Sequence, residues 1–331
     1  MKVSILVTTY NLEKYIEQTL ESILQQDYSD YEILVGDDGS TDKTVEIVKS
    51  FIDRYPERIR LFQMPRETGV EYNKVVRSAE NRLTLWAQAK GEYCSFLDGD
   101  DYYSSPDRIS KMVTVLESPE NRDCIMCAHN LSLVYEDGTS TPLCRAKKEQ
   151  KFSVQQYWEL MFLQANALLF RNVFAAHPPE GALAKNFDDN NITYYLFQFG
   201  KMYYLPDCMG AYRQLSGSSW NSNDALKKAC SNMIGYSIEL MIAPENRKLS
   251  LVRHYPDFQL LYAQRDALHP ESAMPFYQTA KEQNLTMALA IYEHKESRDG
   301  AKNLKRLKNA GRMGYYLAKF RRAAKKMLGR Y

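Results

Sequence analysis

The stretch Val3-Ser-Ile-Leu-Val-Thr-Thr-Tyr-Asn11 decides the fold of the first half of the chain. Its first six residues are mostly apolar and β-branched, which is typical of a strand buried on both faces of a sheet. The run ends in polar residues, and Ile16, Leu20 and Ile23 then recur at helical spacing. We therefore predict a strand followed by a helix, with Asn11 as the helix cap.

The same alternation continues along the chain. Further strand-like segments occupy residues 31–35, 59–63 and 93–97, and a helical segment lies at 45–52. Strands that alternate with helices and return in parallel predict an open α/β sheet. Two later strands are expected at 167–170 and 201–205. Residues from about 224 to 297 have a helical pattern with few β-branched runs.

Composition excludes several classes of protein. The 331 residues are 44% hydrophobic and 25% charged, as in soluble globular proteins rather than disordered, collagen-like or multi-span membrane chains. The first apolar run, 5–7, is too short for a signal peptide, so we expect six reduced cysteines and a cytoplasmic protein. Cys124 and Cys127 form a C-x-x-C in a strand-like setting, where a metal or redox role is disfavoured.

Polar clusters follow three strands of the predicted sheet. They are Thr8-Thr9-Tyr10-Asn11, the run from Asp37 to Asp42, and Asp98-Gly99-Asp100-Asp101. Ligands of open α/β sheets bind beyond the carboxyl ends of the strands. One such cluster would be ordinary turn chemistry, but three at successive strand ends favour a binding site.

The Asp98–Asp101 cluster predicts a hard divalent cation. Carboxylates of Asp98 and Asp100 on a tight turn suit Mg²⁺ or Mn²⁺, and Gly99 allows the bend. An EF-hand would need Glu at the twelfth loop position, where Ile109 stands. The chain has neither a G-x-x-x-x-G-K-[ST] nor a G-x-G-x-x-G motif. A nucleotide diphosphate held mainly by metal and scattered cations is the expected ligand.

Three motifs in order resemble those of a family 2 glycosyltransferase of bacterial surface-glycan type. They are the opening stretch to Asn11, Asp37-Asp-Gly-Ser-Thr-Asp42, and Ala89-Lys-Gly-Glu-Tyr93 leading into Phe96-Leu-Asp-Gly-Asp-Asp101. The resemblance covers about residues 1–215 and implies the GT-A fold, a Rossmann-like open mixed sheet, here with a C-terminal helical extension. It also implies an inverting, metal-dependent transferase.

The reaction implied by the resemblance moves a sugar from a nucleotide diphosphate to a hydroxyl of a growing surface polysaccharide or lipid-linked glycan. UDP-hexose or UDP-N-acetylhexosamine is the expected donor, although thymidine and guanosine donors also occur on similar scaffolds. We expect a GT-A domain over 1–215, a helical accessory region over 216–297 and a basic amphipathic tail over 298–331.

The resemblance also assigns the donor site. Thr9, Tyr10 and Asn11 belong to the nucleotide pocket, and Asp37 and Asp38 contact the base and ribose.

Asp98 and Asp100 match the D-x-D motif, in which Asp98 also lies in the donor site and Asp100 is the more direct ligand of Mn²⁺ or Mg²⁺. Arg213 is the phosphate partner in a Tyr-Arg-x-His-x-x-Ser loop, in which this chain has Leu215 at the His position. Trp220, just beyond this loop, is a candidate for stacking on a sugar.

Asp188-Asp189 stands where the family has Glu-Asp at the head of a helix. The resemblance implies that Asp189 is the general base, and the Asp for Glu replacement leaves open whether Asp188 has this role instead. The alternative is a helix N-terminal cap, which the helix dipole also favours.

Residues 72–88 depart from the family pattern because the segment is longer and contains Lys74, Arg77, Arg82 and Trp86. It either covers the donor or acceptor side of the site or is an extended surface helix. We favour the surface helix.

The formal charge of +2 conceals a basic tail. Residues 298–331 contain twelve Lys or Arg and one acid, a net charge of +11, which leaves −9 for the rest of the chain. The pattern from 304 to 328 predicts a basic amphipathic helix, with Gly311 and Gly314 as breaks. It would lie on an anionic membrane, bind nucleic acid, or pack on the body. We favour the membrane and no nucleic-acid partner, which places the protein at the inner face of the cell membrane.

Two other functions share parts of this pattern. A sugar-phosphate nucleotidyltransferase should show a Gly-rich loop with Arg or Lys after the first strand, which Thr8-Thr9-Tyr10-Asn11 is not. A non-catalytic GT-A-like membrane adaptor would not need the intact set of Asp98, Asp100 and Asp189.

Overall fold

The computed structural model describes residues 2–144, 146–160, 163–216, 224–264, 276, 278–285 and 298–327. The chain divides into two compact units. Unit 1 contains residues 1–154 and 162–214, and unit 2 contains residues 155–161 and 215–331.

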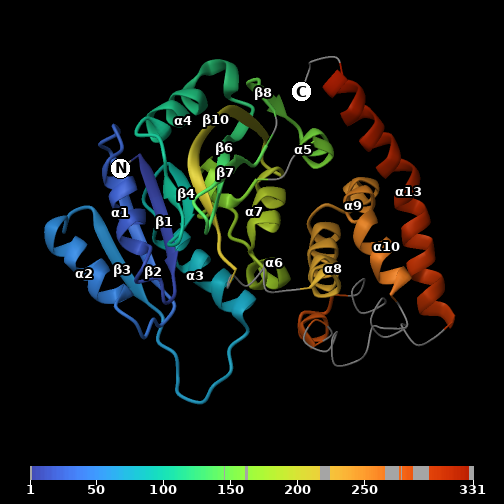
Figure 1. Ribbon diagram of the computed structural model, residues 1–331, viewed down its shortest axis with the longest axis horizontal. Helices are drawn as coiled ribbons and strands as arrows, with labels where there is room; N and C mark the ends of the chain where they lie inside the picture. Colours follow the sequence, from blue (N-terminus) through green and yellow to red (C-terminus); the bar gives the residue numbers. More distant parts are fainter. Residues whose placement is uncertain are drawn as a thin grey trace. The chain divides into compact units, whose positions relative to one another are not determined.

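The centre of unit 1 is a mixed sheet in the order β3-β2-β1-β4-β9-β6-β10-β5 (Figure 1). The first four strands of this order are parallel, as the sequence predicts, while β9 is antiparallel to both of its neighbours. The strands are β1 (Val3–Thr9), β2 (Tyr31–Asp37), β3 (Ile59–Gln63), β4 (Tyr93–Asp98), β5 (Tyr102–Tyr103), β6 (Cys124–Tyr135), β7 (Ser140–Pro142), β8 (Gln150–Phe152), β9 (Leu168–Arg171) and β10 (Lys201–Gln214).

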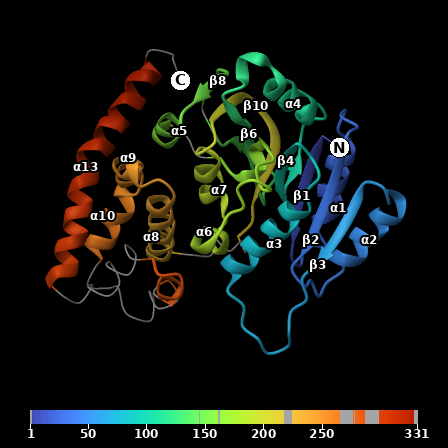
Figure 2. The ribbon, with the colours of Figure 1, turned by 180° about the vertical axis from the view of Figure 1, so that it is seen from behind.

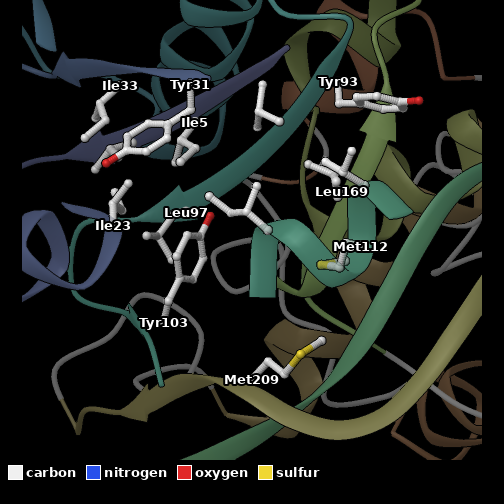
Figure 3. Close-up of a cluster of buried hydrophobic side chains, with 14 of the residues drawn as sticks. Ile5, Ile23, Tyr31, Ile33, Tyr93, Leu97, Tyr103, Met112, Leu169 and Met209 are labelled. Carbon is white, nitrogen blue, oxygen red and sulfur yellow. The ribbon is translucent and has the colours of Figure 1, made fainter. Parts of the chain in front are cut away.

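Alternate residues of β1, β2 and β4 face two different helix layers, because successive side chains of a strand point to opposite faces. One face packs on α1 (Ile16–Leu24), α2 (Thr44–Arg54) and α4 (Arg108–Glu117). Figure 3 shows part of this core, with Ile5, Ile33 and Leu97 from the sheet, Ile23 from α1 and Met112 from α4. All five side chains are at most 1% exposed.

The other face of the sheet is covered by α3 (Lys74–Gln88), a helix as expected for residues 72–88, which buries one side on the sheet and exposes the other. Trp86 is 1% exposed and its ring lies 6.0 Å from that of Phe96 on β4. The helix comes so close to β2 that a Cβ on Gly36 would lie 1.9 Å from Asn81 Oδ1. Asn81 Nδ2 instead donates to the Gly36 carbonyl at 2.8 Å.

The expected cap by Asn11 is wrong. The first helix begins only at Ile16, without a side-chain cap. Asn11 has a positive φ of 52°, a conformation that Asn tolerates better than most residues. Its Oδ1 accepts from the backbone N–H of Thr41 at 2.8 Å, so it holds the loop after β2.

The remaining elements of unit 1 are short and lie around the later strands. They are η1 (Pro119–Asn121), η2 (Ala165–Ala167), α6 (Gly181–Lys185) and α7 (Asp189–Leu196).

The regular elements described in unit 2 are helices, joined by turns and short connections. They are α5 (Val154–Leu160), of which only the first residue belongs to unit 1, α8 (Ala225–Ile242), η3 (Pro244–Asn246), α9 (Arg247–Arg253), α10 (Tyr255–Ala263) and α13 (Arg298–Met327). The long helix α13 runs beside α9 and α10 in both ribbon views (Figure 1, Figure 2). It is continuous through Gly311 and Gly314, so the expected breaks are wrong. A search of the described helices finds none with the length and apolarity needed to span a bilayer.

Candidate active site

The register of the parallel strands brings the three polar clusters to one edge of the sheet. On β1, Thr8 pairs with Asp98 of β4, and Thr9 pairs with Asp37 of β2. Thr8 Oγ1 donates to Asp98 Oδ1 at 2.7 Å, and Asp38 N–H donates to the Thr9 carbonyl at 2.9 Å. Residues separated by up to 90 positions therefore meet because their strands end together.

The turn after β4 is held by backbone contacts. Gly99 N–H donates to the Thr8 carbonyl at 2.8 Å, and a Cβ on Gly99 would lie only 3.0 Å from that oxygen. Thr19 Oγ1 of α1 lies 2.8 Å from the Gly99 carbonyl and 2.7 Å from that of Asp101. The close approach explains Gly at the second position of the D-x-D sequence.

The buried side chain of Asp101 stabilises the turn after β4 by accepting hydrogen bonds from two other segments. It is 1% exposed, and its carboxylate accepts from Arg213 N–H at 2.8 Å and from Asn166 Nδ2 at 2.7 Å. Burial, together with the charges of Asp100 and Asp98, raises its pKa well above the usual range. Asp101 thus connects the acidic turn to β10 and η2.

Asp98 and Asp100 fit a divalent cation that also contacts substrate or water. Burial and the negative charge of Asp98 raise the pKa of Asp100 to about 6, although Arg213 opposes this shift. A bound cation would relieve the repulsion between the two carboxylates. Among the described residues, no group of three or more His, Cys, Asp or Glu side chains forms a metal site. Cations with few protein carboxylates usually complete their shell with water and substrate phosphates, as Mg²⁺ does.

Asp188 and Asp189 differ in what their side chains do. Asp188 is the N-cap of α7, and its Oδ1 accepts from Asn191 N–H at 2.9 Å. Asp189 Oδ1 lies 3.3 Å from Ala165 N and 3.4 Å from Arg82 Nη2. Burial raises the pKa of Asp189 to about 6; Arg82 opposes the shift, whereas Asp98 and Asp188 add to it. A carboxylate with this pKa is ionised near neutral pH and is a stronger base than an exposed Asp.

Arg82 of α3 joins the acidic turn to α7. Its side chain is 8% exposed, and Nη2 lies 3.2 Å from Asp98 Oδ1 and 3.4 Å from Asp189 Oδ1. A third hydrogen bond runs from Nη1 to the Phe187 carbonyl at 3.2 Å. One guanidinium nitrogen, Nη2, therefore bridges the candidate metal-binding turn and the candidate base.

Arg213 lies on β10, beside the acidic turn that follows β4. Its guanidinium donates to the Asp100 carbonyl and to Gln18 Oε1 of α1. The rings of Tyr102 and Tyr15 lie 4.7 and 5.1 Å from the guanidinium carbon. The expected phosphate partner is thus placed next to Asp100.

A second cluster surrounds Asp38, where the nucleotide is expected. Arg77 Nε donates to Asp38 Oδ1 at 2.7 Å, and Arg66 makes an ion pair with Oδ2 and donates from Nε to the Asp38 carbonyl at 2.8 Å. The Arg66 guanidinium also stacks 4.0 Å from the ring centroid of Tyr10, which is 42% exposed. The Tyr10 ring is therefore bordered by Arg66, which links it to the Asp38 carboxylate that Arg77 also binds.

Asp37 and Thr9 lie beneath this cluster. Both oxygens of the buried Asp37 carboxylate accept hydrogen bonds from the following turn, from Gly39 N–H at 3.1 Å and from Ser40 N–H at 2.9 Å and Oγ at 2.5 Å. Thr9 Oγ1 is buried and has no hydrogen-bond partner within the described ranges. Asn11 lies in the same group, with its N–H 2.8 Å from Ser40 Oγ.

Sequence reasoning missed the roles of Arg66, Arg77 and Arg82. For the two arginines of α3 a signal existed: Arg77 lies four residues before Asn81, and Arg82 lies four residues before Trp86, so each pair lies about one helical turn apart. Arg66 lies in a loop where spacing carries no such information. Trp220 and residues 217–219 of the expected phosphate loop lie outside the described residues.

Comparison with known proteins finds a matching family model and relatives of similar sequence. The family model described as "Glycosyl transferase family 2" matches residues 4–177. An uncharacterised protein of Mycobacterium tuberculosis is 29% identical over 226 residues, which is 66% of this chain and 60% of the relative. The chain therefore spans less than two thirds of that relative's length.

Two solved structures have a similar fold at low sequence identity. Staphylococcus aureus TarS 1–349 in complex with UDP has a TM-score of 0.61 at 17% identity, covering 95% of this chain and 92% of that one. The mannosyltransferase PcManGT of Pyrobaculum calidifontis, in complex with GDP-Man and Mn²⁺, has a TM-score of 0.51 at 16% identity, covering 100% and 88%.

Proposed function

The chain belongs to glycosyl transferase family 2, and on this premise we propose that it transfers a sugar, with inversion, from a nucleotide-diphosphate donor to an acceptor hydroxyl. The observation that carries the proposal is the Asp189–Arg82–Asp98 bridge, with Asp100 on the same turn. The bridge supports the proposal because Asp189, with a pKa raised to about 6, lies beside the turn that we propose for the cation and the diphosphate.

Asp189 is the proposed general base. It takes the proton of the acceptor hydroxyl while the acceptor oxygen forms its bond to the anomeric carbon. The bond between that carbon and the diphosphate oxygen breaks at the same time, and the electron pair leaves with the diphosphate. Asp188 is not the proposed base, because its carboxylate caps α7.

Asp98 and Asp100 are the proposed ligands of Mn²⁺ or Mg²⁺, with Asp100 as the more direct one because Asp98 is already paired with Arg82. The cation, when bound, neutralises charge on the diphosphate. Arg213 lies close enough to Asp100 to contact the same phosphates.

Donor recognition is proposed for the cluster around Asp38. The exposed ring of Tyr10 offers a stacking surface for the base, and Arg66 and Arg77 offer donors for its carbonyl oxygens or the ribose. Thr9, Asn11 and Asp37 complete the pocket by shaping the loops beneath it. Uridine is the proposed nucleoside of the donor, supported by the UDP complex of TarS.

The proposed acceptor is a growing surface polysaccharide or a lipid-linked glycan. The name of Staphylococcus aureus TarS, poly(ribitol-phosphate) beta-N-acetylglucosaminyltransferase, describes a polymer acceptor and supports this proposal. With such an acceptor, the proposed location of the enzyme is the cytoplasm at the inner face of the membrane. No nucleic-acid partner is part of the proposal.

A thermal-shift screen of nucleotide sugars, with and without Mn²⁺, tests the donor assignment. We expect the largest stabilisation from one UDP-sugar and a clear loss of that shift when Mn²⁺ is left out. Pyrophosphate release from a sugar phosphate and a nucleoside triphosphate would instead show a nucleotidyltransferase.

The catalytic assignment is tested with Asp189→Asn, which keeps the shape of the side chain and removes the base. We expect transfer to fall by about 10²–10⁴-fold while the donor-induced thermal shift is retained. The matched control Asp188→Asn, which can still accept at the cap, should keep transfer within a few-fold. Unchanged transfer by Asp189→Asn would remove this residue from the base role.

A further inference from the structure

The helix α13 has two apolar faces, and the other helices of unit 2 cover only one of them. Leu304, Leu307 and Ala318 are at most 9% exposed. A Cβ on Gly311 would lie 2.5 Å from the Leu251 carbonyl of α9, and a Cβ on Gly314 would lie 2.4 Å from Val252 Cγ2. The two glycines therefore allow a close approach between α13 and α9, and this face is fully used in packing.

The opposite face carries large apolar side chains that are exposed. They are Met313 (71% exposed), Tyr316 (49%), Leu317 (50%) and Phe320 (70%). Their spacing of three, four and seven residues places them in one row on the helix. We call this row the apolar stripe.

Basic side chains border the apolar stripe. Lys305, Arg312 and Lys319 follow one another at intervals of seven residues, so they form a second row parallel to the stripe. Arg321 lies on the other border, since it is displaced from Phe320 by one helical step in the opposite direction. All four basic residues are exposed.

We propose that the apolar stripe inserts into the surface of an anionic membrane while the bordering basic residues contact lipid phosphates. A helix with exposed large apolar side chains and a basic border is the arrangement that binds at the level of the lipid headgroups. A second copy of the chain is disfavoured as the occupant, because it would bring two rows of like charge together. Nucleic acid would use the charges and leave the stripe exposed to water.

The apolar residues of α13 fall into two groups, those that pack inside unit 2 and those that are available to contact lipid. Leu304 and Leu307, which belong to the amphipathic pattern of the sequence, are unavailable to lipid because they are buried in unit 2. Leu317 and Phe320 are the residues whose removal should affect membrane binding and leave folding unchanged.

Sedimentation of the full chain with vesicles tests the proposal. We expect binding to vesicles of phosphatidylcholine mixed with phosphatidylglycerol, little binding to phosphatidylcholine alone, and weaker binding at high salt. The variant Leu317→Ser/Phe320→Ser should bind the mixed vesicles at least about tenfold more weakly than the unchanged chain. The variant Arg312→Gln/Lys319→Gln should lose most of the salt-dependent part of vesicle binding.

The matched control is Met241→Ser, because Met241 is 59% exposed on α8 and lies outside the stripe. It should bind vesicles like the unchanged chain, and all variants should keep the same unfolding curve and UDP-induced thermal shift. This second readout keeps a failure of the membrane proposal distinct from a failure of the donor assignment.

Three outcomes would overturn the proposal. The full chain could fail to sediment with the mixed vesicles, or the stripe variant could sediment as well as the unchanged chain. A dimer in solution that becomes a monomer only in the stripe variant would show that a second copy covers the stripe.

Discussion

Replacing Arg82 with Met tests the central bridge of the site, because Met keeps much of the side chain's length and removes its charge and donors. In the unchanged protein the guanidinium compensates Asp98 at 3.2 Å and Asp189 at 3.4 Å. Without it, two carboxylates would remain next to each other in a site that already raises the pKa of Asp189 to about 6.

The magnitude follows from the exposure of the three side chains. Breaking a fully buried ion pair by removing one partner costs about 3–5 kcal/mol. Arg82 is 8% exposed, but Asp98 and Asp189 are 37% and 27% exposed, so water screens part of the repulsion left behind. We therefore expect a loss of about 2–3 kcal/mol in the free energy of unfolding at pH 7.

The loss should depend on pH with a definite sign. Arg82 lowers the pKa of Asp189, so its removal raises that pKa further. Lowering the pH from 7 to 5 then protonates Asp189 and relieves the repulsion, and the destabilisation should become smaller. Urea unfolding at both pH values measures this difference, and Arg82→Lys is the matched control, since it keeps the charge but loses the fork.

Kinetics give an independent readout of the same change. The low-pH limb of the transfer rate should move to higher pH in Arg82→Met, because the base is protonated more easily. An equal destabilisation at pH 5 and pH 7, together with an unmoved pH–rate limb, would refute the idea that Arg82 sets the charge state of Asp189.

Three further predictions rest on other contacts. In the unchanged enzyme, transfer should fall as the pH is lowered through about 6, the raised pKa of Asp189, and a flat initial rate from pH 7 to 5 would contradict its role as base. Gly36→Ala should destabilise unit 1 by about 1–3 kcal/mol in urea unfolding, because the new Cβ would lie 1.9 Å from Asn81 Oδ1, whereas Gly138→Ala, at a site with nothing within 4 Å, should disturb no packing and cost only its positive φ. In unit 2, the buried Glu239 lies 3.3 Å from His254, and the interaction raises the pKa of His254 and lowers that of Glu239. The stabilisation by this pair should therefore be greatest between the ordinary pKa values of the two groups, 4.5 and 6.5, and should fall as the pH rises through the raised pKa of His254. Thermal unfolding across pH should show this dependence in the unchanged chain and its loss in Glu239→Gln.

Local patterns in the sequence were enough to predict the sheet and its polar edge. The β-branched run at Val3–Thr9 and its successors describe strands buried on both faces, and parallel strands must end at the same edge. The positions of Asp38 and Asp98 at that edge therefore needed no structure. The pairing of Asp188 with the helix N-terminus was also foreseen as an alternative, because capping is a local interaction.

What remained hidden involves contacts between distant segments. Arg82 meets the Phe187 carbonyl across 105 positions, and no local pattern records which face of α3 the sheet covers. The amphipathic pattern of 298–331 likewise cannot tell Leu307, which packs on unit 2, from Phe320, which is exposed.

The sequence alone thus determined which segments form strands and helices and which acidic residues stand at the strand ends, because periodicity and turn chemistry act over a few residues. Only the tertiary structure decided which cation compensates those acids and which face of α13 meets the solvent. Both depend on burial and charge pairing between segments that come together only when the chain is folded.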